Sequence, residues 1–161
     1  MRKATTRQKM LRAVLSENSF FLTEGHDILV DEFGKDYSVY FSILSLLAQG
    51  YTTRGDIQSV LNIELGGYLT KLENWYGLIR RHIPLGAKPG SKNIRYTLED
   101  KFLSFWFRFI YKYRSTIEIG NLDYVLEVVE RDYETYSGRV LEDYFKEKLA
   151  QSKQYTEIAS Y

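Results

Sequence analysis

Basic side chains gather on one stretch of the sequence, between residues 78 and 98. They flank or occupy a loop of turn-forming residues that runs from Pro84 to Asn93. The cationic set comprises Arg80, Arg81, His82, Lys88, Lys92 and Arg95. Cations clustered in this way favour contacts with the phosphates of duplex DNA. Two alternatives stay open: the charges are simply solvated, or they dock on the acidic segment 99–161.

The helix expected just before this loop offers little for reading base edges. Lys71 and Asn74 are its candidate DNA contacts, and Glu73 lies between them. Asn74 falls near the end of the helix, whereas residues that read bases usually lie toward the beginning. The pattern therefore predicts backbone contacts rather than sequence-specific recognition.

We find no constellation that predicts catalysis, a metal or a cofactor. The chain has no cysteine, and its two histidines, His26 and His82, lie far apart. No GxSxG nucleophile motif occurs, and Glu142 is more typical of a carboxylate on the surface or at the cap of a helix than of a catalytic residue. We expect this chain to have no enzymatic activity of its own.

The elements that position the basic residues follow from the apolar periodicity. We predict helices over 38–49, 53–61 and 65–76, and strands over 78–83 and 94–98. Gly50 and Gly77 end two of the helices, and Thr53 with Asp56 forms a variant of the capping box. The order helix, short helix, helix, strand, long loop, strand is typical of a winged helix-turn-helix.

Further helices are expected on both sides. Before the winged helix, the pattern predicts helices over 6–18 and 26–33, with a break at residues 23–25. After it, Glu99 and Asp100 precede a helix over 101–114, apolar on all sides and therefore buried on more than one side. Two more helices are predicted over 122–133 and 136–150, and a strand over 155–161.

Arg108 lies within the aromatic run of that buried helix. A buried arginine is normally paired, so we predict an internal ion pair with Glu99, Asp100 or Glu118. A cation–π contact with a neighbouring ring is the alternative.

The length and composition of the chain limit its number of domains, its charge and its fold class. With 161 residues the chain holds one domain or two small ones, and its 22 basic and 21 acidic residues give a net charge of +1. Residues 41–98 carry seven basic and three acidic residues, whereas residues 99–161 carry nine and twelve. No apolar run approaches a membrane span. We expect a mainly α, α+β protein located in the cytoplasm.

Residues from about 20 onward resemble the C-terminal half of the archaeal-type AAA+/STAND-like P-loop ATPases. The matching pieces include "Ala48-Gln49-Gly50", "Gly77-Leu78-Ile79" and, most specifically, the "FLxFWFRFI" run over 102–110. In that family a winged helix follows the ATPase module and precedes a domain similar to PD-(D/E)xK nucleases.

The resemblance implies three parts: the end of an ATPase lid over 1–37, the winged helix over 38–98, and the start of a nuclease-like domain over 99–161. No GxxxxGK[ST] loop is present, so the ATPase module is absent from this chain. The nuclease-like region also stops before the strands that would carry its remaining metal ligands.

Two functional hypotheses follow. The first is a non-catalytic DNA-binding or regulatory winged helix of an ATPase, which contacts DNA through its basic wing. The second is a protein-interaction scaffold that docks a partner domain, the missing ATPase module or a second copy of the chain.

Overall fold

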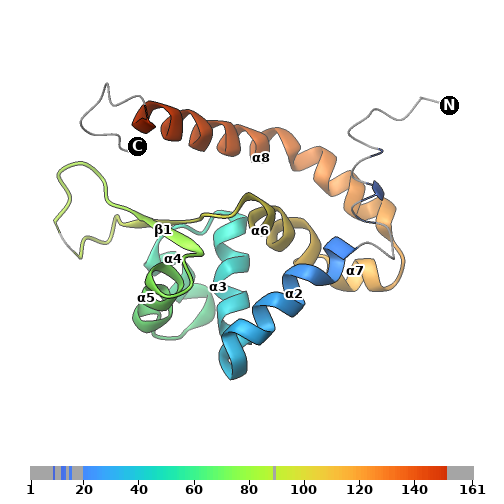
Figure 1. Cartoon of the computed structure of the whole chain (residues 1–161), viewed down its shortest axis with the longest axis horizontal. Coiled ribbons are helices and arrows are strands. Elements are labelled where there is room, and N and C mark those ends of the chain that lie inside the picture. The colour runs from blue at the N-terminus through green and yellow to red at the C-terminus, as the bar shows by residue number, and fades with distance from the viewer. Residues whose placement is uncertain (1–8, 10–11, 14, 16–19, 89, 152–161) are drawn as a thin grey trace.

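The computed structural model describes residues 20–88 and 90–151, together with Lys9, Arg12, Ala13 and Leu15; side chains are described there except at 20, 21, 24, 25 and 138–151. The chain is mainly helical with one antiparallel hairpin, as predicted (Figure 1). The elements are α2 (Phe20–Phe33), the 3₁₀ turn η1 (Gly34–Asp36), α3 (Tyr37–Gln49), α4 (Arg54–Leu61), α5 (Gly66–Asn74), β1 (Ile79–His82), β2 (Arg95–Leu98), α6 (Lys101–Phe105), the π-helix η2 (Trp106–Tyr111), α7 (Arg114–Glu118) and α8 (Leu122–Gln151).

Helix α3 lies at the centre of the molecule (Figure 1). Its inward side chains are all buried: Tyr40, Phe41, Ile43, Leu44, Leu47 and Ala48. The helix ends at Gly50, whose φ of 100° belongs to the left-handed region that favours glycine. This confirms the predicted helix and its end.

Helices α4 and α5 and the hairpin complete the winged-helix arrangement. Thr53 caps α4, because its hydroxyl oxygen accepts a hydrogen bond from the backbone N–H of Asp56 at 3.1 Å. In the hairpin, Ile79 pairs with Leu98 and His82 pairs with Arg95. The predicted helices and strands over 38–98 are thus confirmed, with ends shifted by one or two residues.

Helix α2 runs without interruption from Phe20 to Phe33, so the predicted break at residues 23–25 is wrong. A glycine inside a helix costs about 0.5–1 kcal/mol. Burial of Leu29 and packing of Leu22 against the core outweigh that cost. Most of the helix predicted over 6–18 lies outside the described residues.

The aromatic segment is not the single helix predicted over 101–114. It begins as α6, passes into the π-helix η2 and ends before α7, which Arg114 begins. Trp106, Phe107, Phe109 and Ile110 are all buried there. A π-turn widens the helix, and here consecutive rings reach neighbours on two sides. Phe107 packs on Phe41 of α3 at 5.5 Å between ring centroids, and Phe109 packs on Tyr136 of α8 at 5.6 Å.

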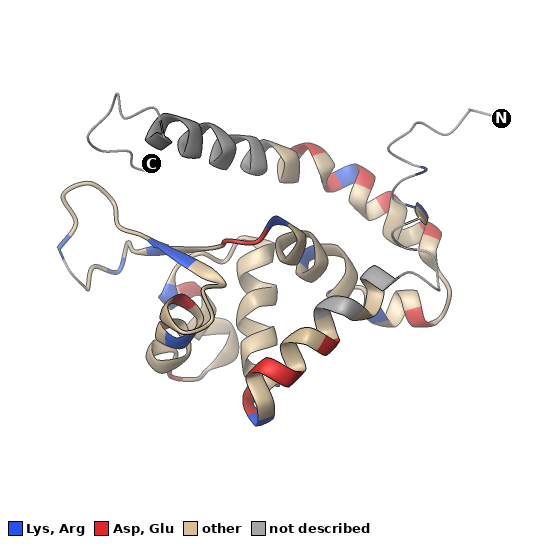
Figure 2. Ribbon diagram, in the orientation of Figure 1, with Lys and Arg blue, Asp and Glu red and all other residues tan. Residues whose placement is uncertain are grey.

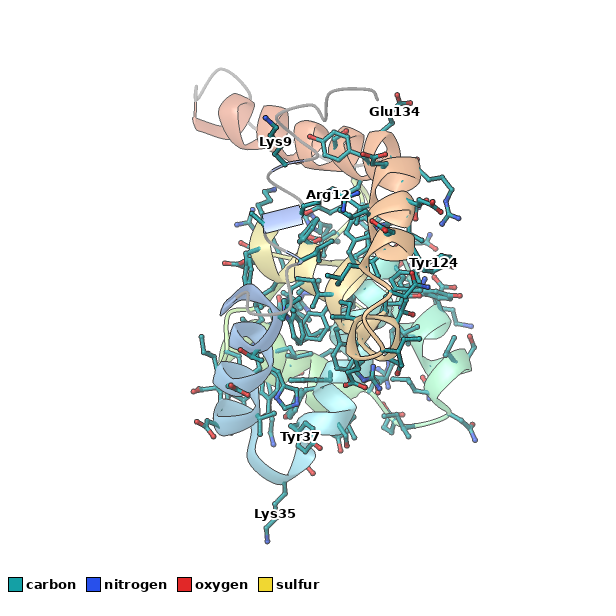
Figure 3. The ribbon with its side chains drawn as sticks, turned by 90° about the vertical axis from the view of Figure 1, so that its right-hand side faces the viewer. Lys9, Arg12, Lys35, Tyr37, Tyr124 and Glu134 are labelled. Carbon is teal, nitrogen blue, oxygen red and sulfur yellow. The ribbon has the colours of Figure 1, made fainter. Side chains whose placement is uncertain are left out.

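Helix α8 is one long helix, whereas two helices were predicted over 122–133 and 136–150. The reason is that residues 134 and 135 are Glu and Thr, and neither ends a helix as Gly or Pro does. Near its start, Asp123 pairs with Arg12 at 3.1 Å, and Arg12 lies beside this part of α8 in Figure 3. The strand predicted over 155–161 and the side chain of Glu142 lie outside the described residues.

Candidate nucleic-acid interface

The wing is the loop over residues 83–94, and it extends away from the body of the molecule (Figure 1). Gly86 and Gly90 turn its backbone at φ values of 77° and 82°. Hydrogen bonds from Ala87 N–H to the Pro84 carbonyl and from Ser91 N–H to the Lys88 carbonyl, each 3.0 Å long, brace the turns. Local backbone hydrogen bonds thus brace the loop, and the side chains of Lys88, Lys92 and Asn93 are exposed on it.

Backbone contacts join the base of the wing to the residues just before α4. Thr53 forms an isolated antiparallel bridge with Arg95. Beside it, the N–H of Tyr96 donates to the carbonyl of Thr52 at 2.7 Å. These contacts hold the cap of α4 beside the returning strand of the wing.

Three predicted cations are free to meet a partner. Lys88, Lys92 and Arg95 are exposed, and no ion pair among the described residues includes them. Figure 2 shows Lys and Arg along the hairpin and wing, and acidic residues at the β2–α6 turn and on the first part of α8. The wing therefore presents positive charge that no acidic side chain in the described part of the chain neutralises by an ion pair.

The other two predicted arginines on the hairpin have acidic partners within the chain. Arg80 pairs with Glu99 at 2.7 Å, and Arg81 pairs with Glu73 of α5 at 3.4 Å. The Arg80 pair agrees with the alternative in which the hairpin docks on the acidic segment. His82 lies within the hairpin, where its Nε2 is 2.7 Å from the hydroxyl of Thr97.

The exposed face of α5 is poor in side chains that could read bases. The helix begins with Gly66 and Gly67, which have no side chains. Lys71 lies with its Nζ 5.4 Å from the centre of the Trp75 ring, and Asn74 is exposed. The predicted residues Lys71 and Asn74 are thus at the surface, toward the end of the helix.

A groove of about 600 Å³ lies between the wing and the beginning of α4. Its lining residues are Thr53, Arg54, Gly55, Gln58, Arg81, Gly90, Ser91, Lys92, Ile94 and Tyr96. Three of these are cations that come from three separate elements: Arg54 from α4, Arg81 from β1 and Lys92 from the wing. None of the lining side chains is acidic.

Carboxylates of α5 and its preceding turn orient two of the groove arginines. Arg54 forms an ion pair with Glu64, and the same Glu64 oxygen accepts the N–H of Gly66 at 3.1 Å. Glu73 holds Arg81 in the same way. Each guanidinium has five N–H donors, so one carboxylate leaves others available.

Tyr96 forms part of the groove wall, and both groove arginines affect the pKa of its phenol. Burial raises the pKa of Tyr96, and Arg81 and Arg54 oppose that rise, whereas Glu73 adds to it. Sequence reasoning missed Arg54 and Tyr96 as site residues. The signal that could have found them is the winged-helix order itself, which brings the start of the short helix to the returning strand of the wing.

Arg108 is an internal tie, as predicted, but its acidic partner is different. Its guanidinium donates to the carbonyl of Ala48 at 3.1 Å and lies 3.9 Å from Asp132 of α8. It also lies 5.4 Å from the ring centre of Phe109. Glu99 pairs with Arg80 instead, because β2 ends beside β1 and directs Glu99 toward the hairpin.

The described part of the chain contains no cluster of three or more His, Asp or Glu side chains placed to hold a metal ion. Likewise, none of the helices described here is both long enough and apolar enough to span a bilayer.

Comparison with known proteins places the second part of the chain near a family without an assigned role. Residues 106–161 match DUF234, described as archaeal and bacterial proteins of unknown function. The chain is also 33% identical over 131 residues to an uncharacterized protein of Methanocaldococcus jannaschii. That match covers 80% of this chain and 29% of the relative, so the chain spans less than a third of the relative's length. No solved structure matches significantly.

Proposed function

We propose that this chain is a non-catalytic module that binds duplex DNA through the phosphate backbone, with the wing as its main contact. The observation that carries the proposal is a set of three exposed cations that have no ion-pair partner among the described residues: Lys88, Lys92 and Arg95. Lys88 and Lys92 lie on the wing, and Arg95 begins the strand β2 that follows it.

Recognition of a particular base sequence is not part of the proposal. The first turn of α5 has two glycines, and Glu73 is engaged with Arg81. Phosphate contacts position a protein on DNA but carry no direct sequence information. Binding should therefore be of similar strength for unrelated duplexes of equal length.

The test is a fluorescence-anisotropy titration of a labelled duplex at several salt concentrations. Each neutralised phosphate contributes about −0.9 to the slope of log K against log salt. Replacement of Lys88, Lys92 and Arg95 by Ser should reduce the magnitude of that slope by about 3 and weaken binding. An unchanged affinity in the triple variant would sink the proposal.

We further propose that the module works beside a P-loop ATPase module. The resemblance of residues 20–161 to the C-terminal half of archaeal-type ATPases supports this, as does the greater length of the matched relative. An immunoblot of source cells tests it. A native band more than twice the size of this chain is expected, and a band of this chain's own size would contradict it.

Protein docking is the second candidate, and exposed apolar side chains favour it. Trp75 is 73% exposed at the end of α5, and Ile119 is 79% exposed between α7 and α8. A docking surface of this kind binds with little dependence on salt. Sedimentation at low and high salt separates the two: a salt-insensitive dimer would support docking of a second copy.

A further inference from the structure

The groove between the wing and α4 combines features that call for an anionic ligand. Three cations, Arg54, Arg81 and Lys92, converge on it from separate elements. Thr53 and Ser91 line the same space, and so does Gly55 in the first turn of α4. The Thr53 hydroxyl donates to the Asp56 carboxylate, so it serves the helix cap rather than a ligand. Backbone N–H groups in the first turn of a helix lack intrahelical acceptors, and the helix dipole favours negative charge there.

We infer that this groove is a phosphate seat that holds a phosphate group between Lys92 of the wing and Arg54 and Arg81 of the winged-helix body. The inference deepens the proposed function and rests on it for the source of the phosphate, which is the DNA backbone. It adds a defined site below the wing, which the exposed wing cations alone do not require.

The ion pairs around the groove hold two of its arginines in place before a phosphate binds. Glu64 and Glu73 hold the two arginines at the groove wall from the side of α5. A guanidinium so oriented loses less side-chain freedom when it binds a phosphate. Lys92 has no ion-pair partner among the described residues and contributes the uncompensated charge. Glu64 and Glu73 are therefore positioning residues.

The groove is large enough for more than one phosphate group. Its volume of about 600 Å³ lies within the range of small-molecule sites. Ile94 and the ring of Tyr96 form an apolar part of its lining. A phosphate with its attached sugar, as in a nucleic-acid strand, would use both the cationic and the apolar parts.

Two variants test the seat by independent means. Lys92→Ser removes charge from the groove. Lys35→Ser, at an exposed lysine of η1 outside the groove lining and outside the proposed DNA contacts, is its matched control. Gly55→Gln fills the groove without a change in charge. A Cβ at Gly55 would meet only the Thr53 hydroxyl, at 3.9 Å, so the fold accommodates it. Ser59→Gln, exposed on the same helix, is the control.

The probe for the seat itself is inorganic pyrophosphate, followed by the amide NMR signals of Gly55 and Ser91. We expect these signals to shift on titration. Lys92→Ser and Gly55→Gln should each weaken pyrophosphate binding roughly tenfold, as for loss of charge-assisted hydrogen bonds. Lys35→Ser and Ser59→Gln should leave it unchanged. The same four variants are then tested on a duplex by anisotropy.

The outcomes separate the seat from the proposed function. If the duplex binds but Gly55→Gln and Lys92→Ser bind both probes as the unaltered protein does, the seat is overturned and the proposed function stands. If pyrophosphate binds in the groove but no duplex binds, the seat stands with a free phosphate compound as its ligand. If neither probe binds, both are overturned.

Discussion

The winged helix of residues 37–98 and the region of residues 101–137 both contain arginines and aromatic rings, but they place them differently. In the winged helix, Arg54, Arg81 and Arg95 lie at the surface of a groove or loop. In the second region, Arg108 lies between α3 and α8, and its side chain is only 14% exposed. Under the proposed function the first region uses its cations to contact DNA, whereas the second region uses Arg108 to hold α3 and α8 together.

The two tryptophans also differ in burial, and this difference predicts the largest effect on the free energy of unfolding. Trp106 is 1% exposed and packs on Phe41 and Tyr111, whereas Trp75 is 73% exposed. Trp106→Ala should lower the free energy of unfolding by about 3–5 kcal/mol, because it leaves a cavity in the core. Trp75→Ala should change it by less than about 0.5 kcal/mol. Urea denaturation followed by circular dichroism measures both; similar losses for the two variants would contradict the contrast.

The contacts of Arg108 with α3 and α8 predict the next largest effect on the free energy of unfolding. Arg108→Met should lower the free energy of unfolding by about 2–3 kcal/mol, because it removes the bonds to Ala48 and Asp132. Arg131, an exposed partner of the same Asp132, is the matched control. Arg131→Met should cost less than about 1 kcal/mol. Equal costs in denaturant titrations would mean that Arg108 is not the structural tie.

The buried tyrosine of α3 predicts a dependence on pH. Burial, with Tyr76 close by, raises the pKa of Tyr40 to about 12, above the ordinary value near 10. The folded state therefore binds the phenol proton more tightly than the unfolded state. The resulting stability is full below pH 10 and is lost as pH rises toward 12, by about 2 kcal/mol. Unfolding of Tyr40→Phe should show a smaller decline over that range; an identical decline would contradict this assignment.

The wing predicts the smallest effect on stability. Replacement of Lys88, Lys92 and Arg95 by Ser should change the free energy of unfolding by no more than about 0.5 kcal/mol, because these exposed side chains have no ion-pair partners in the described chain. Thermal denaturation of this variant should overlay that of the unaltered protein. A loss above about 1 kcal/mol would show that the wing cations support the fold.

The sequence was most informative where local signals agree with one another. Gly50 ends α3 because its left-handed backbone suits glycine, and Thr53 caps α4 through its hydroxyl. The alternation of apolar and polar residues identified the second strand of the hairpin, Arg95–Leu98. These features depend on residues close in sequence, so a pattern along the chain is enough to predict them.

The predictions were wrong where contacts between residues far apart in the sequence determine the structure. Gly25 is accommodated inside α2 because Leu29 is buried against the core. The π-helix of residues 106–111 depends on rings that reach α3 and α8 at the same time. The partner of Arg108 is Asp132, 24 positions away. The groove was missed for the same reason, since its cations come from residues 54, 81 and 92.

The most direct test of the account locates the DNA on the molecule. Hydrogen–deuterium exchange is measured by mass spectrometry for the chain alone and with a saturating duplex of arbitrary sequence. We predict slower exchange in peptides over residues 83–96 and in the first turn of α4, with no change over α8. Protection confined to residues 101–137, or none anywhere under conditions where the duplex is bound, would contradict the division between a wing that binds and an aromatic region that holds the fold together.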